Sequence, residues 1–135
     1  MAEKTGSKNR RVKTELNEEA LKRDIGFSPH KGQLDVLNSS AREVVICAGR
    51  RWGKSAICAY MALKMILEPG RRVWIVAPTY DLTRKVFDYV VRWYLKINPQ
   101  GGKGISYRPT PKIQCPTGSI LECRSTENPA GLLGE

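Results

Sequence analysis

The sequence predicts an α/β fold in which helices flank a parallel sheet. Two short apolar runs rich in β-branched residues, at residues 43–48 and 71–78, have the length and the turn signals of strands buried on both faces. A segment with helical character follows each of them. Strands that alternate with helices build parallel sheets, because each crossover returns the chain in the same direction.

The segments after these runs supply the helices. Residues 53–67 are apolar nearly all round and end before Pro69 and Gly70, which predicts a helix packed on the sheet. Residues 81–97 carry apolar side chains at helical spacing, with Asp81 as a candidate N-cap. The predicted buried face of this helix consists of Leu82, Val86, Phe87, Val90, Val91, Tyr94 and Leu95.

The two ends of the chain differ in character. Residues 1–26 are predicted to form a basic, flexible tail with room for one short helix at residues 14–24. A second short helix is expected after Pro29. Residues 112–123 are predicted to form two strands joined by a turn at residues 116–118, where Pro, Thr and Gly follow one another.

Composition limits the classes of function. Of 135 residues, 23 are Lys or Arg and 13 are Asp or Glu, which gives a net charge of +10. This excess indicates an anionic partner, most simply nucleic acid, although a soluble surface with a basic tail would give the same balance. His30, the single histidine, cannot complete a zinc site with the scattered cysteines. The longest apolar-rich stretch, residues 56–67, is too short to cross a bilayer.

A phosphate-binding loop is predicted where the first strand meets the first helix. The stretch CAGRRWGKS, residues 47–55, ends in Gly-Lys-Ser, as a Walker A motif does. Glycine lets backbone N–H groups turn inward around a phosphate, and the helix N-terminus adds a positive dipole. Ala48, followed by Gly49, replaces the usual first glycine. A plain strand-to-helix turn is the alternative interpretation.

The residues of this loop have distinct expected roles. Lys54 is predicted to reach the β- and γ-phosphates of ATP, and Ser55 to offer its hydroxyl to the Mg²⁺ that bridges them. Arg50 and Arg51 are candidates to stabilise charge on the γ-phosphate or to couple ATP to a partner, and a surface ion pair is the alternative for one of them. Trp52 is expected to cover apolar surface beside the loop.

Four segments, in sequence order, resemble the large terminase subunit, the ATPase that packages DNA into tailed-phage capsids. CAGRRWGKS looks like its Walker A loop, in which the first glycine is often replaced and an arginine stands inside the loop. FSPHKGQLDVL is similar to the upstream segment with its proline and glutamine. VWIVAPTYDLTRKVF looks like the next strand and helix, and CPTGSILECRSTENPAGLLGE like the hairpin and loop that lead toward Walker B.

The resemblance implies a fold and a nucleotide. Residues 27–135 are identified as the N-terminal part of a P-loop NTPase-type ATPase domain, truncated before Walker B, with ATP and Mg²⁺ as cofactors. Gln33 is similar to the family's adenine-reading glutamine, and a solvated helix glutamine is the alternative. Phe27 either packs on the adenine face or staples the following helix.

The resemblance also sets the expected site residues. Arg50 takes the position where the family tends to keep its loop arginine, so the expected catalytic residues are Lys54 and Arg50. Ser55 is the expected Mg²⁺ ligand. The expected nucleotide-binding residues are Gln33, Ala48, Gly49, Arg50, Arg51, Trp52, Gly53, Lys54 and Ser55.

The expected partners follow from the same family. ATP hydrolysis in a ring of subunits would drive double-stranded DNA through a portal protein, while a small terminase subunit chooses the DNA. A protein of this kind works in the cytoplasm of the infected bacterial host, at the portal of the procapsid during packaging, and not in a membrane.

Two parts of the family's pattern are not found in residues 1–135. No apolar strand ends in the Asp-Glu of Walker B, and no acidic cluster suits a nuclease. Leu133 stands where some members have a trans-acting arginine. These residues are therefore expected to have no ATPase activity by themselves.

Two alternative functions remain open. One is the first half of a helicase-like, nucleic-acid-dependent ATPase, although Arg51 stands where that loop would have glycine. The other is a non-catalytic nucleic-acid-binding module with a vestigial P-loop.

Overall fold

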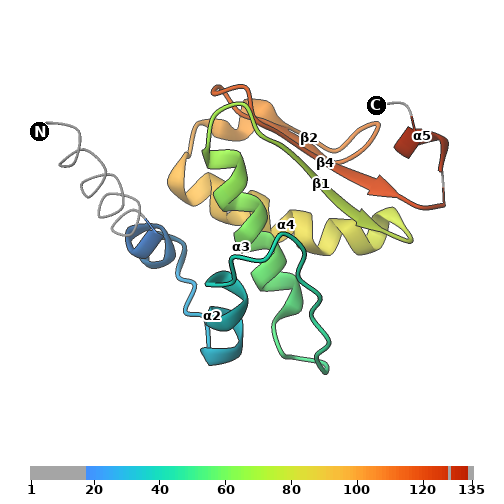
Figure 1. Ribbon diagram of the computed structural model, residues 1–135. Helices are drawn as coiled ribbons and strands as arrows, with labels where there is room; N and C mark the ends of the chain where they lie inside the picture. The colour runs from blue at the N-terminus through green and yellow to red at the C-terminus, as the bar shows by residue number, and fades with distance from the viewer. Residues whose placement is uncertain (1–17, 128, 134–135) are drawn as a thin grey trace, which may run out of the picture.

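The computed structural model describes residues 18–127 and 129–133, and it confirms the predicted α/β class (Figure 1). A helix at residues 18–25 comes first. The elements that follow are α2 (Lys31–Leu37), α3 (Lys54–Leu67), β1 (Arg72–Ala77), α4 (Tyr80–Ile97), the 3₁₀ turn η1 (Gly101–Gly104), β2 (Ile105–Ser106), β3 (Lys112–Gln114), β4 (Ile120–Ser125) and α5 (Ala130–Leu133).

The sheet has the strand order β1-β4-β3-β2 and is mixed. β1 and β4 run parallel, with Val73 opposite Leu121, because α4 lies in the crossover between them. β3 and β4 run antiparallel, because a tight turn joins them in which the Gly118 N–H donates to the Cys115 carbonyl at 3.0 Å. The predicted hairpin is therefore confirmed, and the predicted parallel pairing is confirmed for β1 with β4.

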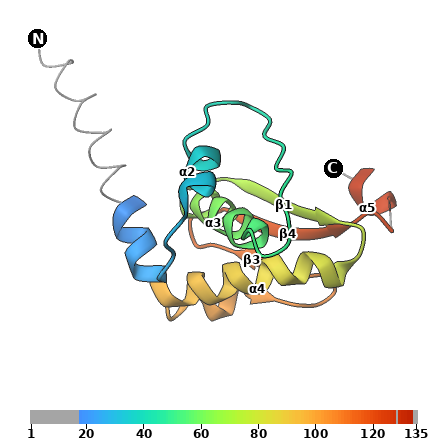
Figure 2. The ribbon, with the colours of Figure 1, turned by 90° about the horizontal axis from the view of Figure 1, so that it is seen from below.

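The helices α3 and α4 cover one face of the sheet, as two views show (Figure 1 and Figure 2). Exposure alternates along β1. Val73 and Ile75 pack against the core, whereas Trp74 and Val76 lie on the other face with 41% and 48% of their surface exposed. The prediction that this strand is buried on both faces is wrong, because the described helices cover only one of them.

The core forms between α3, α4 and the covered face of the sheet. Each fully buried aliphatic or aromatic side chain contributes about 1.5–3 kcal/mol relative to an exposed one. This layer fixes α3 on the sheet and so fixes the loop that precedes α3. Fully buried core side chains include Ile57, Tyr60, Leu63, Ile66, Phe87, Val90, Ile113, Leu121 and Cys123.

The buried stripe of α4 is rotated from the predicted one. Thr79, not Asp81, is the N-cap, and its Oγ1 accepts from the Leu82 N–H at 3.3 Å. Thr83 and Trp93 are buried although the apolar pattern left them out, and Leu82 is 44% exposed. Apolar side chains lie on two neighbouring stripes of this helix, and contact with the sheet and α3 decides which stripe is buried.

Residues 43–48 form no strand, so this part of the prediction is wrong. They lie in the long loop between α2 and α3 (Figure 2), and Val45 is 94% exposed. Their β-branched composition favours extended backbone, but a strand also needs a partner for its N–H and C=O groups. Within the part of the chain that the structure describes, no strand pairs with this segment.

The helix at residues 18–25 packs on α3 and α4. Ile25 is 1% exposed, Lys64 of α3 forms an ion pair with Glu18 at 2.6 Å, and Lys96 of α4 donates to the Ile25 carbonyl at 3.4 Å. Residues 1–17 of the predicted tail lie outside the described residues. Among the described residues, no helix has the length and apolar character that a bilayer span requires.

Candidate functional site

The loop that ends at Gly53 leads directly into α3. Gly53 is the N-cap and has a left-handed backbone with φ 93°, and Arg51 is also left-handed with φ 63°. Left-handed residues in such a turn aim successive N–H groups to one side and create an anion-binding concavity. No acceptor in the described chain takes the backbone N–H groups of residues 50–56. The 14-residue α3 adds the positive end of its dipole at the same place.

The Lys54 side chain folds back across this loop. Its Nζ donates to the Ala48 carbonyl at 2.6 Å and to the Gly49 carbonyl at 2.7 Å. These contacts tie the first residue of α3 to the start of the loop. An ammonium group has three donors, so one donor remains for a ligand oxygen.

The first turn of α2 is locked to the end of the loop. His30 is the N-cap of α2, and it forms a capping box with Gln33 in which each side chain accepts from the backbone of the other. The same two side chains reach the loop. His30 Nε2 lies 2.8 Å from the Trp52 carbonyl oxygen, and Gln33 Nε2 donates to the Gly53 carbonyl at 3.1 Å. The first turn of α2 therefore contacts two loop carbonyls, and the Gly53 carbonyl also accepts from the Ile57 N–H of α3 at 3.1 Å.

The Trp52 ring packs on the same turn of α2. It meets the His30 ring edge-on, with 4.8 Å between the ring centroids. A Cβ atom at Gly32 would lie 3.0 Å from the Trp52 ring, so glycine there permits the close approach. The surface that Trp52 covers is thus the N-terminal cap of α2.

Gln33 is only 4% exposed, so its interpretation as a solvated helix residue is wrong. Its carboxamide oxygen accepts from the His30 N–H at 3.1 Å, and its nitrogen donates to Gly53. A carboxamide has a second N–H and further lone pairs, and these are the groups left to contact a base. Its role toward adenine stays a prediction.

Arg50, Arg51 and Ser55 are exposed at the loop and the first turn of α3. Within the described chain neither arginine has an ion-pair partner, so the alternative of a surface ion pair is not realised there. Both guanidinium groups are therefore available to an anionic ligand, and Ser55 presents a hydroxyl near the same helix end.

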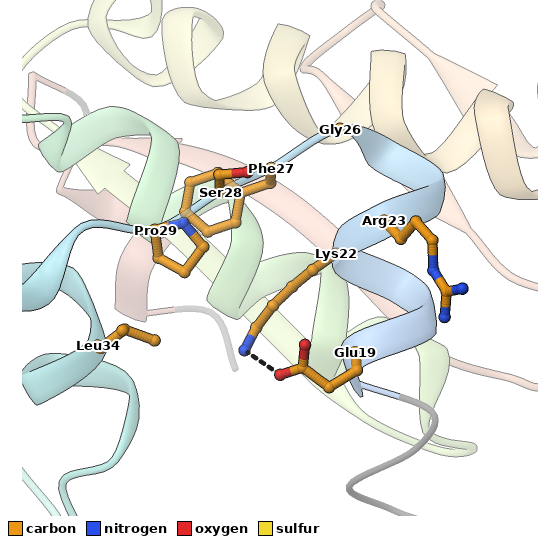
Figure 3. A pocket seen from close by; sticks show the side chains of 8 residues that line it. All are labelled: Glu19, Lys22, Arg23, Gly26, Phe27, Ser28, Pro29 and Leu34. Carbon is orange, nitrogen blue, oxygen red and sulfur yellow. Dashed lines mark hydrogen bonds and ion pairs between the residues drawn. The ribbon is translucent and has the colours of Figure 1, made fainter.

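Phe27 is partly buried and packs against the core. Its ring lies 5.1 Å from the Tyr60 ring and 5.4 Å from the Trp93 ring. Both roles predicted for Phe27, on the adenine face or as a staple of the following helix, stay predictions. Phe27 also lines a pocket of about 690 Å³ between the helix at residues 18–25 and α2, together with Lys22 (Figure 3). None of the lining residues belongs to the loop before α3, so this pocket is separate from the phosphate site.

The described residues contain no cluster of three His, Cys, Asp or Glu side chains that could hold a metal ion. All four cysteines are free thiols. Ser55 is the one predicted metal ligand, and its role toward Mg²⁺ stays a prediction.

His30 is the site residue that sequence reasoning missed, since it was considered only as a zinc ligand. The available signal was its spacing from Gln33. A glutamine three residues after an N-cap is the second half of a capping box, with histidine here in the place of serine or threonine.

No family model matches the sequence. The large terminase subunits of Thermus phage G20c and Thermus virus P23-45 are each 40% identical to it over 68 residues, which is 50% of this chain and 14% of each relative. The large terminase subunit of Escherichia phage T5 is 36% identical over 61 residues, which is 42% of this chain and 14% of that protein.

Solved structures of large terminases also match this chain. The large terminase ATPase domain of Thermus phage P74-26 matches with a TM-score of 0.67 and 25% identity, over 84% of this chain and 52% of that domain. A mutant of that domain matches with a TM-score of 0.63 and 26% identity. The chain thus spans about half of the solved domain. By sequence and by fold, the chain is related to the phage large terminases and corresponds to part of their ATPase domain.

Proposed function

We propose that the loop before α3 binds the phosphates of ATP. The Lys54 ammonium group carries this proposal, because two loop carbonyls hold it at the N-terminus of α3. The N–H groups of residues 50–56, which have no acceptor in the described chain, supply further donors. An ammonium group, oriented amides and a helix dipole together are the chemistry that a polyphosphate requires.

The exposed side chains of the loop complete the proposed site. Bound Mg²⁺ would add positive charge beside the phosphates. Ser55 is the residue that would hold it. Arg50 would offset the charge of the γ-phosphate, and Gln33 would contact the base.

The wider function that we propose is that of the large terminase motor. ATP hydrolysis would drive double-stranded DNA through a portal protein, in a ring of subunits that works with a small terminase subunit at the procapsid in the infected bacterial host. The names of the relatives and the net charge of +10 support this proposal. These comparisons do not favour the helicase-like or vestigial alternatives.

Titration calorimetry with ATP and Mg²⁺ tests the site. Lys54→Ala should bind about 10- to 100-fold more weakly than the wild type, because hydrogen bonds to charged groups contribute about 1.5–3 kcal/mol. Lys85→Ala is the matched control, since Lys85 is an exposed lysine on α4. Equal affinities for the two variants would contradict the assignment, and a wild type that does not bind would favour a vestigial loop.

Base selectivity tests the role of Gln33. ATP is expected to bind more tightly than GTP, and Gln33→Ala should narrow this preference by about 1–2 kcal/mol, the value of one or two neutral hydrogen bonds. The measurement is the ratio of the two dissociation constants. A general weakening through the lost Gly53 contact affects both nucleotides alike and leaves that ratio unchanged. A mutant that keeps the full preference would remove the adenine assignment.

A further inference from the structure

The two hydrogen bonds of the His30 ring fit one tautomer of the neutral imidazole. Its Nδ1 accepts from the Gln33 N–H at 3.4 Å as the N-cap of α2. The ring proton of the neutral imidazole is therefore on Nε2, which then donates to the Trp52 carbonyl at 2.8 Å. One imidazole thus performs two separable tasks: Nδ1 caps a helix, and Nε2 holds a loop carbonyl.

The loop contact determines where the next amide points. Among the described residues the only cis peptide bond precedes Pro109, so the bond between Trp52 and Gly53 is trans. In a planar trans peptide, the C=O and the N–H point in opposite directions. With the Trp52 carbonyl turned toward His30, the Gly53 N–H points away from α2, to the side of the loop that α2 does not cover.

The following peptide is oriented in the same way. Gln33 Nε2 donates to the Gly53 carbonyl, so the Lys54 N–H is also turned away from α2. The left-handed Arg51 and Gly53 allow successive amides to point to one side. The Trp52 ring against His30 keeps the imidazole in place.

We propose that His30 is a positioning residue for phosphate binding, which acts by holding the Gly53 N–H toward the ligand through the Trp52 carbonyl. This inference rests on the proposed binding of ATP by the loop. His30 does not itself touch the ligand. In the free protein it already holds the Gly53 N–H in the direction that a bound phosphate would need.

Two substitutions separate the tasks of the imidazole. His30→Asn keeps an acceptor near the position of Nδ1, and asparagine is a good N-cap, but its side chain is too short to reach the Trp52 carbonyl. His30→Gln has an amide nitrogen that extends about as far as Nε2, but it is a poorer cap. Thermal unfolding measures how much the helix cap stabilises the protein. Titration calorimetry with ATP and Mg²⁺ measures how much the loop contact contributes to binding.

The proposal predicts that the two variants rank in opposite orders for ATP affinity and for thermal stability. His30→Asn should keep the thermal midpoint of the wild type and bind ATP about 3- to 10-fold more weakly, the loss of one neutral hydrogen bond. His30→Gln should have the lower midpoint and the higher affinity of the two. If affinity follows the midpoint instead, or if both variants bind like the wild type, His30 is only a helix cap and the proposal fails. If the wild type itself does not bind ATP, the proposed function falls first, and the inference falls with it.

Discussion

Gly53→Ala is expected to destabilise the protein by about 2–4 kcal/mol and to weaken ATP binding about 10- to 100-fold. At φ 93° a residue with a Cβ atom is strained, at a cost of about 1–3 kcal/mol. The new Cβ would also lie 2.5 Å from Gln33 Nε2, inside any normal contact distance. Gln33 would have to move and give up its bonds to Gly53 and His30, which removes one of the two hydrogen bonds between the first turn of α2 and the loop.

Gly49→Ala is the matched control for this variant. Gly49 lies in the same loop, but its φ is not in the left-handed region, and no atom lies within 4 Å of a Cβ built there. We expect a change in unfolding free energy within about 0.5 kcal/mol, as for an unstrained surface substitution. Urea unfolding and titration calorimetry on both variants make the comparison. Similar losses for the two glycines would show that the loop does not depend on the geometry at Gly53.

Phe87→Ala should lower the free energy of unfolding by about 3–5 kcal/mol, because it removes a fully buried aromatic ring from the core. The Phe87 ring also meets the Tyr107 ring edge-on at 5.5 Å between centroids, and this contact is lost. Urea unfolding, followed by circular dichroism at constant m-value, measures the change.

Leu82→Ala is the control for the core on the same helix. Both residues belong to the apolar pattern from which the buried face of α4 was predicted, yet Leu82 is 44% exposed. Its truncation should cost about 1 kcal/mol or less. If Leu82→Ala destabilises the protein as much as Phe87→Ala, the rotation of the buried stripe is wrong and the sequence pattern gives the better account of this face.

Local signals predicted α3, β1, α4 and the β3–β4 hairpin, because each depends on periodicity or turn residues close in sequence. The orientation of α4 was predicted less well. Val86 and Phe87 both continue an apolar stripe, and only contact with the sheet and α3 decides which stripe is buried. Leu82 shows the limit of the pattern, since nothing in the helix itself distinguishes it from a core leucine.

The prediction of a strand at residues 43–48 was wrong for a related reason. β-Branched composition describes how easily a segment extends, whereas a strand exists only where another backbone pairs with it. Burial of both faces of β1 was likewise predicted, but this would need helices on both sides of the sheet. The described helices lie on only one side. Pairing and covering layers are tertiary properties that a local pattern does not contain.

The phosphate-binding loop was predicted from its glycine, lysine and serine, because the chemistry of phosphate binding constrains their spacing, and its role stays a prediction. The contacts between α2 and this loop could not be predicted from the sequence in the same way. The contacts of His30 with Trp52 and of Gln33 with Gly53 join residues that are distant in sequence. The three-residue spacing of His30 and Gln33 is compatible with a capping box, but it does not indicate that these side chains also reach the loop.

The two carbonyl contacts of Lys54 have an entropic consequence. A mobile lysine side chain loses about 1.5–2 kcal/mol of rotamer freedom when it is fixed. Here Ala48 and Gly49 already hold the ammonium group in the free protein, so this loss belongs to folding and not to ligand binding. If the loop binds phosphate as proposed, this preorganisation should make binding about 10- to 30-fold tighter than at a site whose lysine must be ordered by the ligand. A phosphate at the proposed site would accept from the remaining donor of a side chain whose conformation is already fixed.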